Sequence, residues 1–302
     1  MTAAATVGVL GATSLVGRPL RRQLGAAGAR VVACSRNPPT DSSDAHLVWQ
    51  RSGADLPGAL RVSDWIAACP VWATAAAFDW LVATGLERLV ALSSTSLISK
   101  RASPDAAERA LADRLAEAEA ELTGLAARAG TRLVILRPTM IYDGHRDGNV
   151  AAIAAWVRRW GWFPLCGAAR GLRQPVHADD VATACRAALG HPAPLPAYTL
   201  SGGEPLPFGD LVRRTCEAHG LPPRVVHLPG WAWRPLAGAG RCLGLAAGAT
   251  AGMAARMNED LVFDHSAATA DLGFRPRPFS PTARRLVRGE RPAGPTPPSS
   301  TP

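Results

Sequence analysis

The chain has 302 residues, of which 47% are hydrophobic and 19% are charged. This length and composition predict one large α/β domain with a smaller appended region. The six cysteines, at positions 34, 69, 166, 185, 216 and 242, include no Cys-x-x-Cys pair and no neighbouring histidine pair. The sequence therefore argues against a disulfide scaffold and predicts no metal site.

The net charge of +9 comes from 33 basic residues, all but one of them arginine. Codon bias is one explanation of this excess of basic residues. The alternative is an anionic partner such as a pyrophosphate or an acidic membrane surface. No basic stripe is interleaved with aromatic residues, so nucleic acid is not an expected partner. The first residues, MTAAATV, lack the basic start of a signal peptide, which predicts a cytoplasmic protein. A peripheral place at the inner face of the membrane is the alternative.

The segment Thr6 to Leu24 joins a short apolar run, a glycine turn and an amphipathic helix. The apolar run ends at Gly11, which allows a tight turn, and Gly17 allows the helix to pack closely on the strand. A strand, a glycine turn and a helix in this order present backbone N–H groups to the pyrophosphate of a dinucleotide. This position makes the glycine turn more informative than its spacing alone.

The second expected strand, Val31 to Cys34, ends in Ser35, Arg36 and Asn37. An acidic residue after this strand would bind the ribose hydroxyls of NAD, whereas an arginine suits the 2′-phosphate of NADP. Arg36 therefore favours NADP, with NAD as the second choice. A solvated arginine in a loop is the alternative interpretation.

Strands and helices alternate to about residue 200, which predicts an α/β fold with a doubly wound parallel sheet. Further strands are expected at Trp65 to Ala68, Leu89 to Leu92 and Leu133 to Arg137. A long helix begins with Ser103 as its N-cap and runs to about Gly130. Its charged residues are expected to form a solvated face: Arg109, Asp113, Arg114 and Glu117.

Several later phrases occur in a specific order: LRPTMIYD from Leu136, RQPVHADDVA from Arg173, YTLSGGE from Tyr198 and LGFRP from Leu272. Together with the glycine turn, they resemble the NAD(P)-dependent epimerase/dehydratase family of extended or atypical short-chain dehydrogenases/reductases. The resemblance covers about residues 5–282. The Arg-Gln-Pro-Val phrase is similar to the atypical branch that includes the nucleotide-binding accessory subunit of respiratory complex I.

The resemblance implies a Rossmann fold with a small C-terminal substrate-binding region. It also implies that NADP, or less favourably NAD, contacts residues at the carboxyl ends of successive strands. The expected cofactor-binding residues are Gly11, Ala12, Thr13, Ser14, Leu15, Val16, Gly17, Ser35, Arg36, Asn37, Asp55, Cys69, Pro70, Ser93 and Pro138.

Two departures from the family pattern concern the chemistry. The middle glycine of the family's turn is Ser14 here. Catalytic relatives use a Tyr-x-x-x-Lys pair, in which the lysine lowers the tyrosine pKa for proton exchange. This chain has one lysine, Lys100, and the residue four positions before it is Ser96. The pair is therefore absent from the sequence.

Three residues are candidates for catalysis: Thr95, Lys100 and Tyr142. Thr95 stands where the family places its catalytic serine or threonine; the alternative is that its hydroxyl satisfies backbone groups at a strand end. Lys100 is a candidate replacement proton donor, or a contact to the cofactor ribose, and otherwise a surface lysine. Tyr142 is a further candidate proton donor, although in relatives this position helps to shape the pocket.

The resemblance places Asn149 and Arg173 where nucleotide-sugar enzymes of the family contact the substrate pyrophosphate. A planar guanidinium suits that anion through paired hydrogen bonds. The substrate is therefore expected to be a small molecule, in particular a nucleotide sugar. His177 precedes Asp179 and Asp180, which are expected to cap the next helix.

The predicted organisation is a dinucleotide-binding core at 1–142, a mixed substrate-binding region at 143–285 and a disordered tail at 286–302. Fourteen uncharged residues lie between Arg241 and Arg256, just after Trp231 and Trp233. This segment is too short to span a bilayer as a helix. Interfacial membrane contact and a buried helix are both open, as are a monomer and a homodimer.

Two functions follow from these observations. The first is an NADP-linked oxidoreductase or epimerase that acts on a nucleotide sugar or a related intermediate with an atypical active site. The second is a catalytically inactive NADPH-binding scaffold or accessory protein. Thr95, Asn149 and Arg173 favour the enzyme, whereas the missing tyrosine–lysine pair favours the scaffold.

Overall fold

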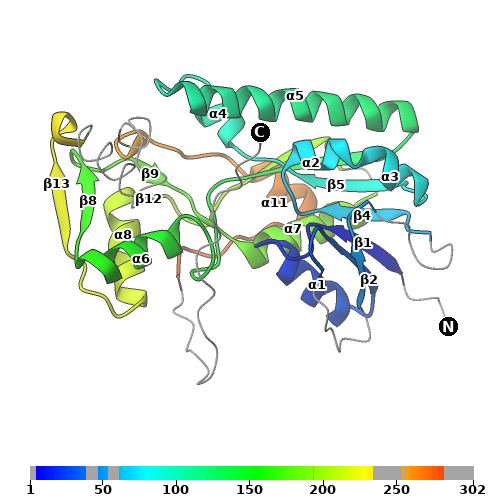
Figure 1. The fold of residues 1–302 in the computed structure, drawn as a ribbon, viewed down its shortest axis with the longest axis horizontal. Coiled ribbons are helices and arrows are strands. Elements are labelled where there is room, and N and C mark those ends of the chain that lie inside the picture. Colours follow the sequence, from blue (N-terminus) through cyan, green and yellow to red (C-terminus); the bar gives the residue numbers. More distant parts are fainter. Residues whose placement is uncertain are drawn as a thin grey trace.

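The computed structural model describes residues 5–38, 47–53, 61–192, 194–233, 254 and 256–281. The predicted contact Asp55, the predicted tail at 286–302 and most of the uncharged segment after Trp233 lie outside these residues. Figure 1 shows a twisted sheet with helices on both faces and a smaller group of elements beside it.

Seven parallel strands form the main sheet in the order β11-β6-β5-β4-β1-β2-β3. This arrangement confirms the predicted doubly wound parallel sheet. Because β1 pairs with β2 on one side and β4 on the other, the chain reverses its direction of winding between β1 and β4. The strands are β1 (Thr6–Leu10), β2 (Arg30–Ser35), β3 (Leu47–Arg51), β4 (Asp64–Ala67), β5 (Arg88–Leu92), β6 (Arg132–Pro138) and β11 (Ala197–Leu200).

Each face of the sheet is covered by its own helices. One core contains Val7, Val9 and Ile66 together with α1 (Gly17–Ala26), α7 (Ala178–Gly190) and α11 (Ser266–Leu272). The opposite core contains Leu10 and Trp65. Its helices are α2 (Val71–Ala76), α3 (Phe78–Ala83) and α5 (Ala106–Ala129). Neighbouring residues of one strand enter different cores because successive strand side chains point to opposite faces.

Gly8 explains how the sheet holds its largest buried side chain. A β-carbon on Gly8 in β1 would overlap the indole ring of Trp65 in the neighbouring β4. The Trp65 ring is fully buried, and its Nε1–H donates to the Val62 carbonyl at 3.0 Å. The glycine therefore leaves the space that this ring needs at the centre of the sheet.

A second group of elements lies at the left of Figure 1. Its core is formed by α6 (Val150–Trp160), β8 (Phe163–Cys166), α8 (Phe208–Ala218) and β13 (Val225–Leu228). Two short strand pairs join this group to the main sheet: β7 (Ile141–Tyr142) with β10 (Val176–His177), and β9 (Leu172–Arg173) with β12 (Leu206–Pro207).

The long helix begins later than predicted. Its N-cap is Asp105, which accepts a hydrogen bond from the Ala107 N–H at 2.9 Å, so the prediction of Ser103 was wrong. The Ser103 hydroxyl instead donates to the Glu108 carboxylate at 2.7 Å. The predicted solvated face is confirmed, because Arg109, Asp113, Arg114 and Glu117 are all exposed. The short helix α4 (Ser96–Ser99) precedes this region.

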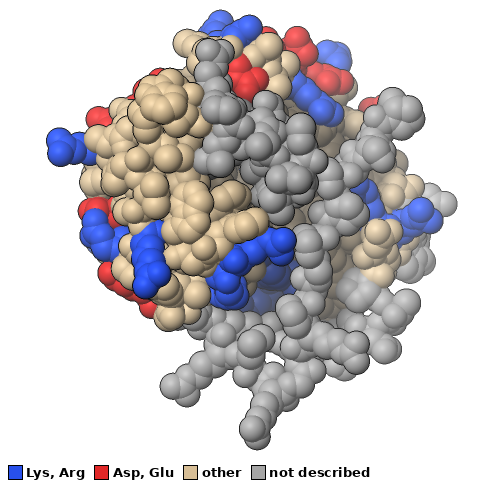
Figure 2. Space-filling model, turned by 60° about the vertical axis from the view of Figure 1, so that its left-hand side comes forward, with Lys and Arg blue, Asp and Glu red and all other residues tan. Residues whose placement is uncertain are grey.

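Figure 2 turns the second group of elements towards the viewer and shows a broad uncharged surface with Lys and Arg at its lower border. Four exposed large hydrophobic residues belong to these elements or follow them directly: Trp160, Val225, Val226 and Trp231. Trp231 is 79% exposed, whereas Trp233 is buried. None of the helices in the described ranges is both long enough and apolar enough to cross a membrane.

Candidate cofactor and active site

The predicted glycine turn lies at the carboxyl ends of β1 and β4, where the sheet reverses its winding. Gly11 has a φ of +76°, in the left-handed region that favours glycine. A β-carbon at this position would lie 2.8 Å from the Ala68 carbonyl oxygen and 3.1 Å from Cys69 Cβ. The turn therefore requires glycine for both its backbone conformation and its close approach to the end of β4.

Gly17 is the first residue of α1, and a β-carbon there would overlap the Gly11 carbonyl oxygen. Ala12 and Val16 are buried beneath the turn. The N-terminus of α1 thus lies directly against the end of β1, in the arrangement that suits a pyrophosphate. Both glycines therefore allow a close approach of backbone to backbone that a β-carbon would prevent, and this close approach shapes the turn.

Ser14 replaces the family's middle glycine without distorting the turn. Its backbone N–H donates to the Gly11 carbonyl at 2.9 Å, and its Oγ accepts from the Gly17 N–H at 3.0 Å. The Ser14 hydroxyl therefore accepts the hydrogen bond of one N–H group at the start of α1. An anion at this turn would meet the Ser14 hydroxyl in place of that amide.

The turn is also joined to the end of β2. Thr13 Oγ1 and Ser35 Oγ are 3.1 Å apart, and Ser35 Oγ accepts from the Asn37 N–H at 3.3 Å. Arg36 is exposed between them. Burial raises the pKa of the Cys69 thiol, and the positive charge of Arg36 partly opposes that rise.

The predicted contacts at the end of β5 differ in their hydrogen bonding. Ser93 Oγ is buried and has no partner among the described residues. Thr95 is 5% exposed, and its hydroxyl donates to the Pro138 carbonyl at 3.2 Å. Thr95 is thus held against the end of β6, whereas the buried Ser93 hydroxyl has no partner in the described part of the chain.

Lys100 lies in an ion cluster at the start of α5. Its Nζ is 3.5 Å from Glu108 Oε1, and Arg256 pairs with the other oxygen of the same carboxylate. Burial raises the pKa of Glu108. The Ser103 hydroxyl, Arg256 and Lys100 together lower it by more than burial raises it, so the pKa lies below its ordinary value. The single lysine therefore pairs with a carboxylate whose charged form burial alone would disfavour.

Tyr142 is completely buried, and its hydroxyl accepts from the Ser280 N–H at 3.2 Å. Its ring packs edge-on against His177 and Phe279, with centroids 5.1 Å and 4.9 Å away. Burial raises the pKa of this phenol. Within the described ranges, no hydrogen bond joins any two of Thr95, Lys100 and Tyr142.

The two predicted substrate contacts have different surroundings. Asn149 is exposed at the start of α6. Arg173 is 5% exposed, and its guanidinium donates to the backbone carbonyls of Leu172, Arg256 and Glu259. Burial lowers the pKa of Arg173 to about 10. In this conformation Arg173 holds the segment at 256–259 against β9, and a pyrophosphate contact would require that clamp to open.

His177 and the acidic pair have roles that the sequence assigned differently. The N-cap of α7 is His177, whose Nδ1 accepts from the Asp179 N–H at 3.1 Å. The prediction that the acidic pair caps the helix was therefore wrong. Asp179 instead pairs with Arg22 at 2.7 Å and Asp180 pairs with Arg277 at 2.6 Å.

The sequence analysis missed two carboxylates. Glu119 in α5 pairs with Arg137 in β6, with both carboxylate oxygens 3.1 Å from the guanidinium Nε. Asp147 is buried and accepts backbone hydrogen bonds from five residues on both sides of it: Asp143, Gly144, Asn149, Val150 and Ala151. An aspartate three residues before a helix is a recognisable capping signal, whereas the Glu119 pair is visible only in three dimensions.

In the part of the chain that the structure describes, no three His, Cys, Asp or Glu side chains are grouped to hold a metal ion. Five cysteines fall in that part, and all are free thiols.

Part of the chain matches the sequence pattern of a known family. Residues 66–200 match the NAD dependent epimerase/dehydratase family. This match confirms the resemblance predicted from the motifs. It includes the ends of β4, β5 and β6 and the segment that carries Arg173, but the glycine turn lies before it. A comparison with curated proteins found no relative.

Several solved structures share the fold. MoeE5, solved with UDP-glucuronic acid and NAD, has a TM-score of 0.64 and 22% identity, covering 91% of this chain and 95% of MoeE5. UDP-N-acetylglucosamine 4-epimerase from Bacillus cereus has a TM-score of 0.64 and 13% identity, covering 90% and 91%. UDP-glucose 4-epimerase from Thermotoga maritima, solved with UDP-glucose, has a TM-score of 0.62 and 14% identity, covering 90% and 93%. At these identities the likeness establishes the fold.

Proposed function

We propose that this protein is an NADP-linked oxidoreductase or epimerase that acts on a nucleotide sugar or a related intermediate. The observation that carries the proposal is the glycine turn between Gly11 and Gly17, whose close backbone packing sets the start of α1 at the carboxyl end of β1. The match of residues 66–200 to the epimerase/dehydratase family adds independent support. A nicotinamide cofactor bound there would supply hydride transfer.

The cofactor is expected to lie along the carboxyl ends of four strands. The turn from Gly11 to Gly17 would hold the pyrophosphate, and Arg36 the 2′-phosphate of NADP. Cys69 and Pro70 border the middle of that path, because a β-carbon on Gly11 would approach Cys69 to 3.1 Å. Ser93 offers a buried hydroxyl with no partner among the described residues at the end of β5.

The preference for NADP rests on charge. Arg36 is exposed directly after β2, at the carboxyl edge of the sheet. A guanidinium in this place would pair with a phosphate dianion, whereas a ribose hydroxyl would gain less from it.

The proposed substrate is a nucleotide sugar because Asn149 leaves an exposed side chain at the start of α6 and the net charge of +9 favours an anion. Arg173 is the second proposed contact. Its clamp on the segment at 256–259 makes substrate binding and the placement of that segment interdependent.

Proton transfer must proceed without a phenol on α5. In its first half, α5 buries Glu108, Ala112 and Leu115. We assign the Thr95 hydroxyl to the substrate and Lys100 to proton delivery, with Tyr142 shaping the pocket from within the core. A positioned acid or base contributes about 10²–10⁴-fold in rate, so slow turnover is expected.

One experiment separates the enzyme from a cofactor-binding scaffold. The full-length protein is melted with NADPH, NADH and a panel of UDP- and GDP-sugars. Turnover is followed by NADPH absorbance for a net redox reaction and by chromatography of the sugars for an epimerisation, which leaves the cofactor unchanged overall. Stabilisation by NADPH, further stabilisation by one nucleotide sugar and turnover of that sugar are the expected results. NADPH binding with no sugar turned over would favour the scaffold. The side chains of Thr95, Lys100 and Tyr142 each have a partner within the protein, which is consistent with that function. No stabilisation by either dinucleotide would overturn both functions.

A further inference from the structure

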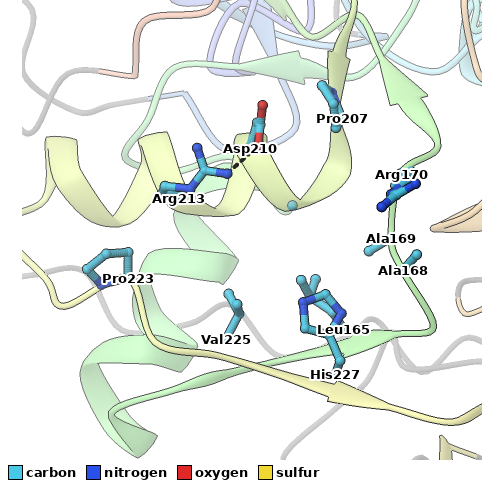
Figure 3. Close-up of a pocket in the computed structure, with 11 residues that line it drawn as sticks. Leu165, Ala168, Ala169, Arg170, Pro207, Asp210, Arg213, Pro223, Val225 and His227 are labelled. Carbon is cyan, nitrogen blue, oxygen red and sulfur yellow. Dashed lines mark hydrogen bonds and ion pairs between the residues drawn. The ribbon is translucent and has the colours of Figure 1, made fainter.

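A pocket of about 540 Å³ lies between the N-terminal half of α8 and the paired strands β8 and β13 (Figure 3). This volume is in the range of small-molecule sites. Neither Asn149 nor Arg173 lines it, and neither does any predicted cofactor contact. The lining residues that matter for its chemistry are Leu165, Ala169, Arg170, Gly209, Arg213 and His227.

One wall of the pocket holds a strained backbone. Ala169 has a φ of +49°, the one non-glycine residue of the described chain in the left-handed region. This conformation is unfavourable for a residue with a β-carbon. It is held from both sides, because the Ala169 N–H donates to Asn258 Oδ1 at 3.0 Å and its carbonyl accepts from the Gly209 N–H at 3.2 Å. Strain that the surroundings maintain in this way clusters at functional sites.

The strained loop presents a guanidinium that the protein itself leaves unused. Arg170 follows Ala169 directly, is exposed, and has no hydrogen bond or ion pair with any residue that the structure describes. Arg213, by contrast, is paired with Asp210. In Figure 3, Arg170 lies on the opposite side of the pocket from Arg213 and Pro223. The net positive charge of the lining is therefore concentrated at Arg170.

A ring nitrogen is also open to the pocket. His227 Nδ1 is 2.7 Å from the Gly167 carbonyl oxygen, which can only accept, so Nδ1 carries the proton in that bond. Nε2 is left for a ligand. The floor beside it is apolar, formed by Leu165 and Val225. The pocket thus combines a cation and a polar ring nitrogen with an apolar surface.

We propose that this pocket binds a small organic phosphate, with the phosphate at Arg170 and an apolar or planar body against Leu165 and Val225. Arg170 supplies the fork of N–H donors that matches phosphate oxygens. This site goes beyond the proposed nucleotide-sugar chemistry and does not depend on it.

Gly209 keeps the pocket open from the helix side. A β-carbon there would meet Leu165 Cδ1 at 3.8 Å and the Ala169 carbonyl oxygen at 3.9 Å, which are ordinary contacts. A longer side chain therefore fits the helix but projects into the space of the ligand. Gly209→Val is accordingly a variant that blocks the pocket without removing a charge.

The test titrates phenyl phosphate, inorganic phosphate and phenol into the full-length protein by calorimetry, with and without NADPH. We expect saturable binding of phenyl phosphate, weaker binding of inorganic phosphate and none of phenol. Arg170→Gln and Gly209→Val should each weaken phenyl phosphate at least tenfold, whereas Arg128→Gln, at an exposed arginine of α5, should leave it unchanged.

Absence of phenyl phosphate binding would overturn the proposal, and so would equal affinity in Arg170→Gln and the unmodified protein. Displacement of phenyl phosphate by NADPH would place the anion at the glycine turn and would also overturn it. Binding that persists in the presence of NADPH supports the second site. Because Arg170 is exposed, its substitution is expected to leave the melting temperature unchanged, which keeps this variant interpretable if Gly209→Val fails to fold.

Discussion

The carbonyl oxygen of Gly11 occupies the place that a β-carbon on residue 17 would need. The two residues are six positions apart in the sequence and enclose the whole turn at the end of β1. Their contact fixes the start of α1 against the strand, so the orientation of the helix N-terminus depends on the absence of one methyl group. The proposed dinucleotide site therefore depends on backbone packing as much as on polar groups.

Gly17→Ala is expected to displace the start of α1 and to weaken NADPH binding at least tenfold, because the added methyl group overlaps the Gly11 carbonyl. Calorimetric titration and thermal unfolding measure the two effects. Gly25→Ala in the same helix is the matched control: nothing lies within 4 Å of its added carbon. That variant should keep its affinity and gain up to about 1 kcal/mol from helix propensity. Equal affinity in both variants would contradict the role of the turn.

Arg36→Ala is expected to weaken NADPH by about 1–3 kcal/mol, the range for a hydrogen bond to a charged group, and to leave NADH nearly unchanged. The reason is that Arg36 lies exposed directly after β2, where its guanidinium would pair with a phosphate. Arg30→Ala, at the exposed amino end of the same strand, is the control. Titration with both cofactors checks the difference, and an equal loss for NADH would remove the proposed 2′-phosphate contact.

Local sequence patterns predicted the elements of this fold because their causes are local. Apolar runs gave β1 and β5, and Gly11 and Gly17 marked the turn between strand and helix. The partners of charged side chains were not predictable in this way. Glu108 and Arg256 are 148 residues apart in the sequence, and nothing near either residue signals that they meet.

Arg173 illustrates the same limit within the candidate site. Its sequence context is that of a substrate-binding arginine, and the structure surrounds it with the backbone carbonyls of Arg256 and Glu259. Those carbonyls come from a segment more than 80 residues later in the chain. Whether a guanidinium meets a ligand or a carbonyl is decided by where such a distant segment passes, which a local motif does not encode.

Ser93→Ala and Thr95→Val are expected to separate cofactor binding from stability. Ser93 Oγ has no partner in the described part of the chain, so its removal should not lower the free energy of unfolding of the unliganded protein. It should weaken NADPH several-fold if that hydroxyl binds the cofactor. Thr95→Val removes a buried hydrogen bond to Pro138 and should cost about 1 kcal/mol. Denaturant unfolding and NADPH titration read the two effects, and unchanged NADPH affinity in Ser93→Ala would exclude the contact.

The last prediction concerns the carboxylate that binds Lys100 and Arg256. Burial raises the pKa of Glu108, but Ser103, Arg256 and Lys100 together lower it below its ordinary value of 4.5. A carboxyl group whose pKa is lowered on folding stabilises the folded state above its unfolded pKa, and this stabilisation is lost as the pH falls through the folded pKa. We therefore expect the unfolding free energy to decline below about pH 4.5, and Glu108→Gln to reduce that decline.

The measurement is chemical denaturation at a series of pH values from about 6 to 3, which brackets the ordinary pKa of a glutamate. Glu117→Gln is the control, since Glu117 lies on the same helix with an exposed side chain. At neutral pH, Glu108→Gln should be less stable than the control variant because two cations lose their shared carboxylate. An identical pH dependence in the two variants would show that the Glu108 cluster does not hold its charge in the folded protein.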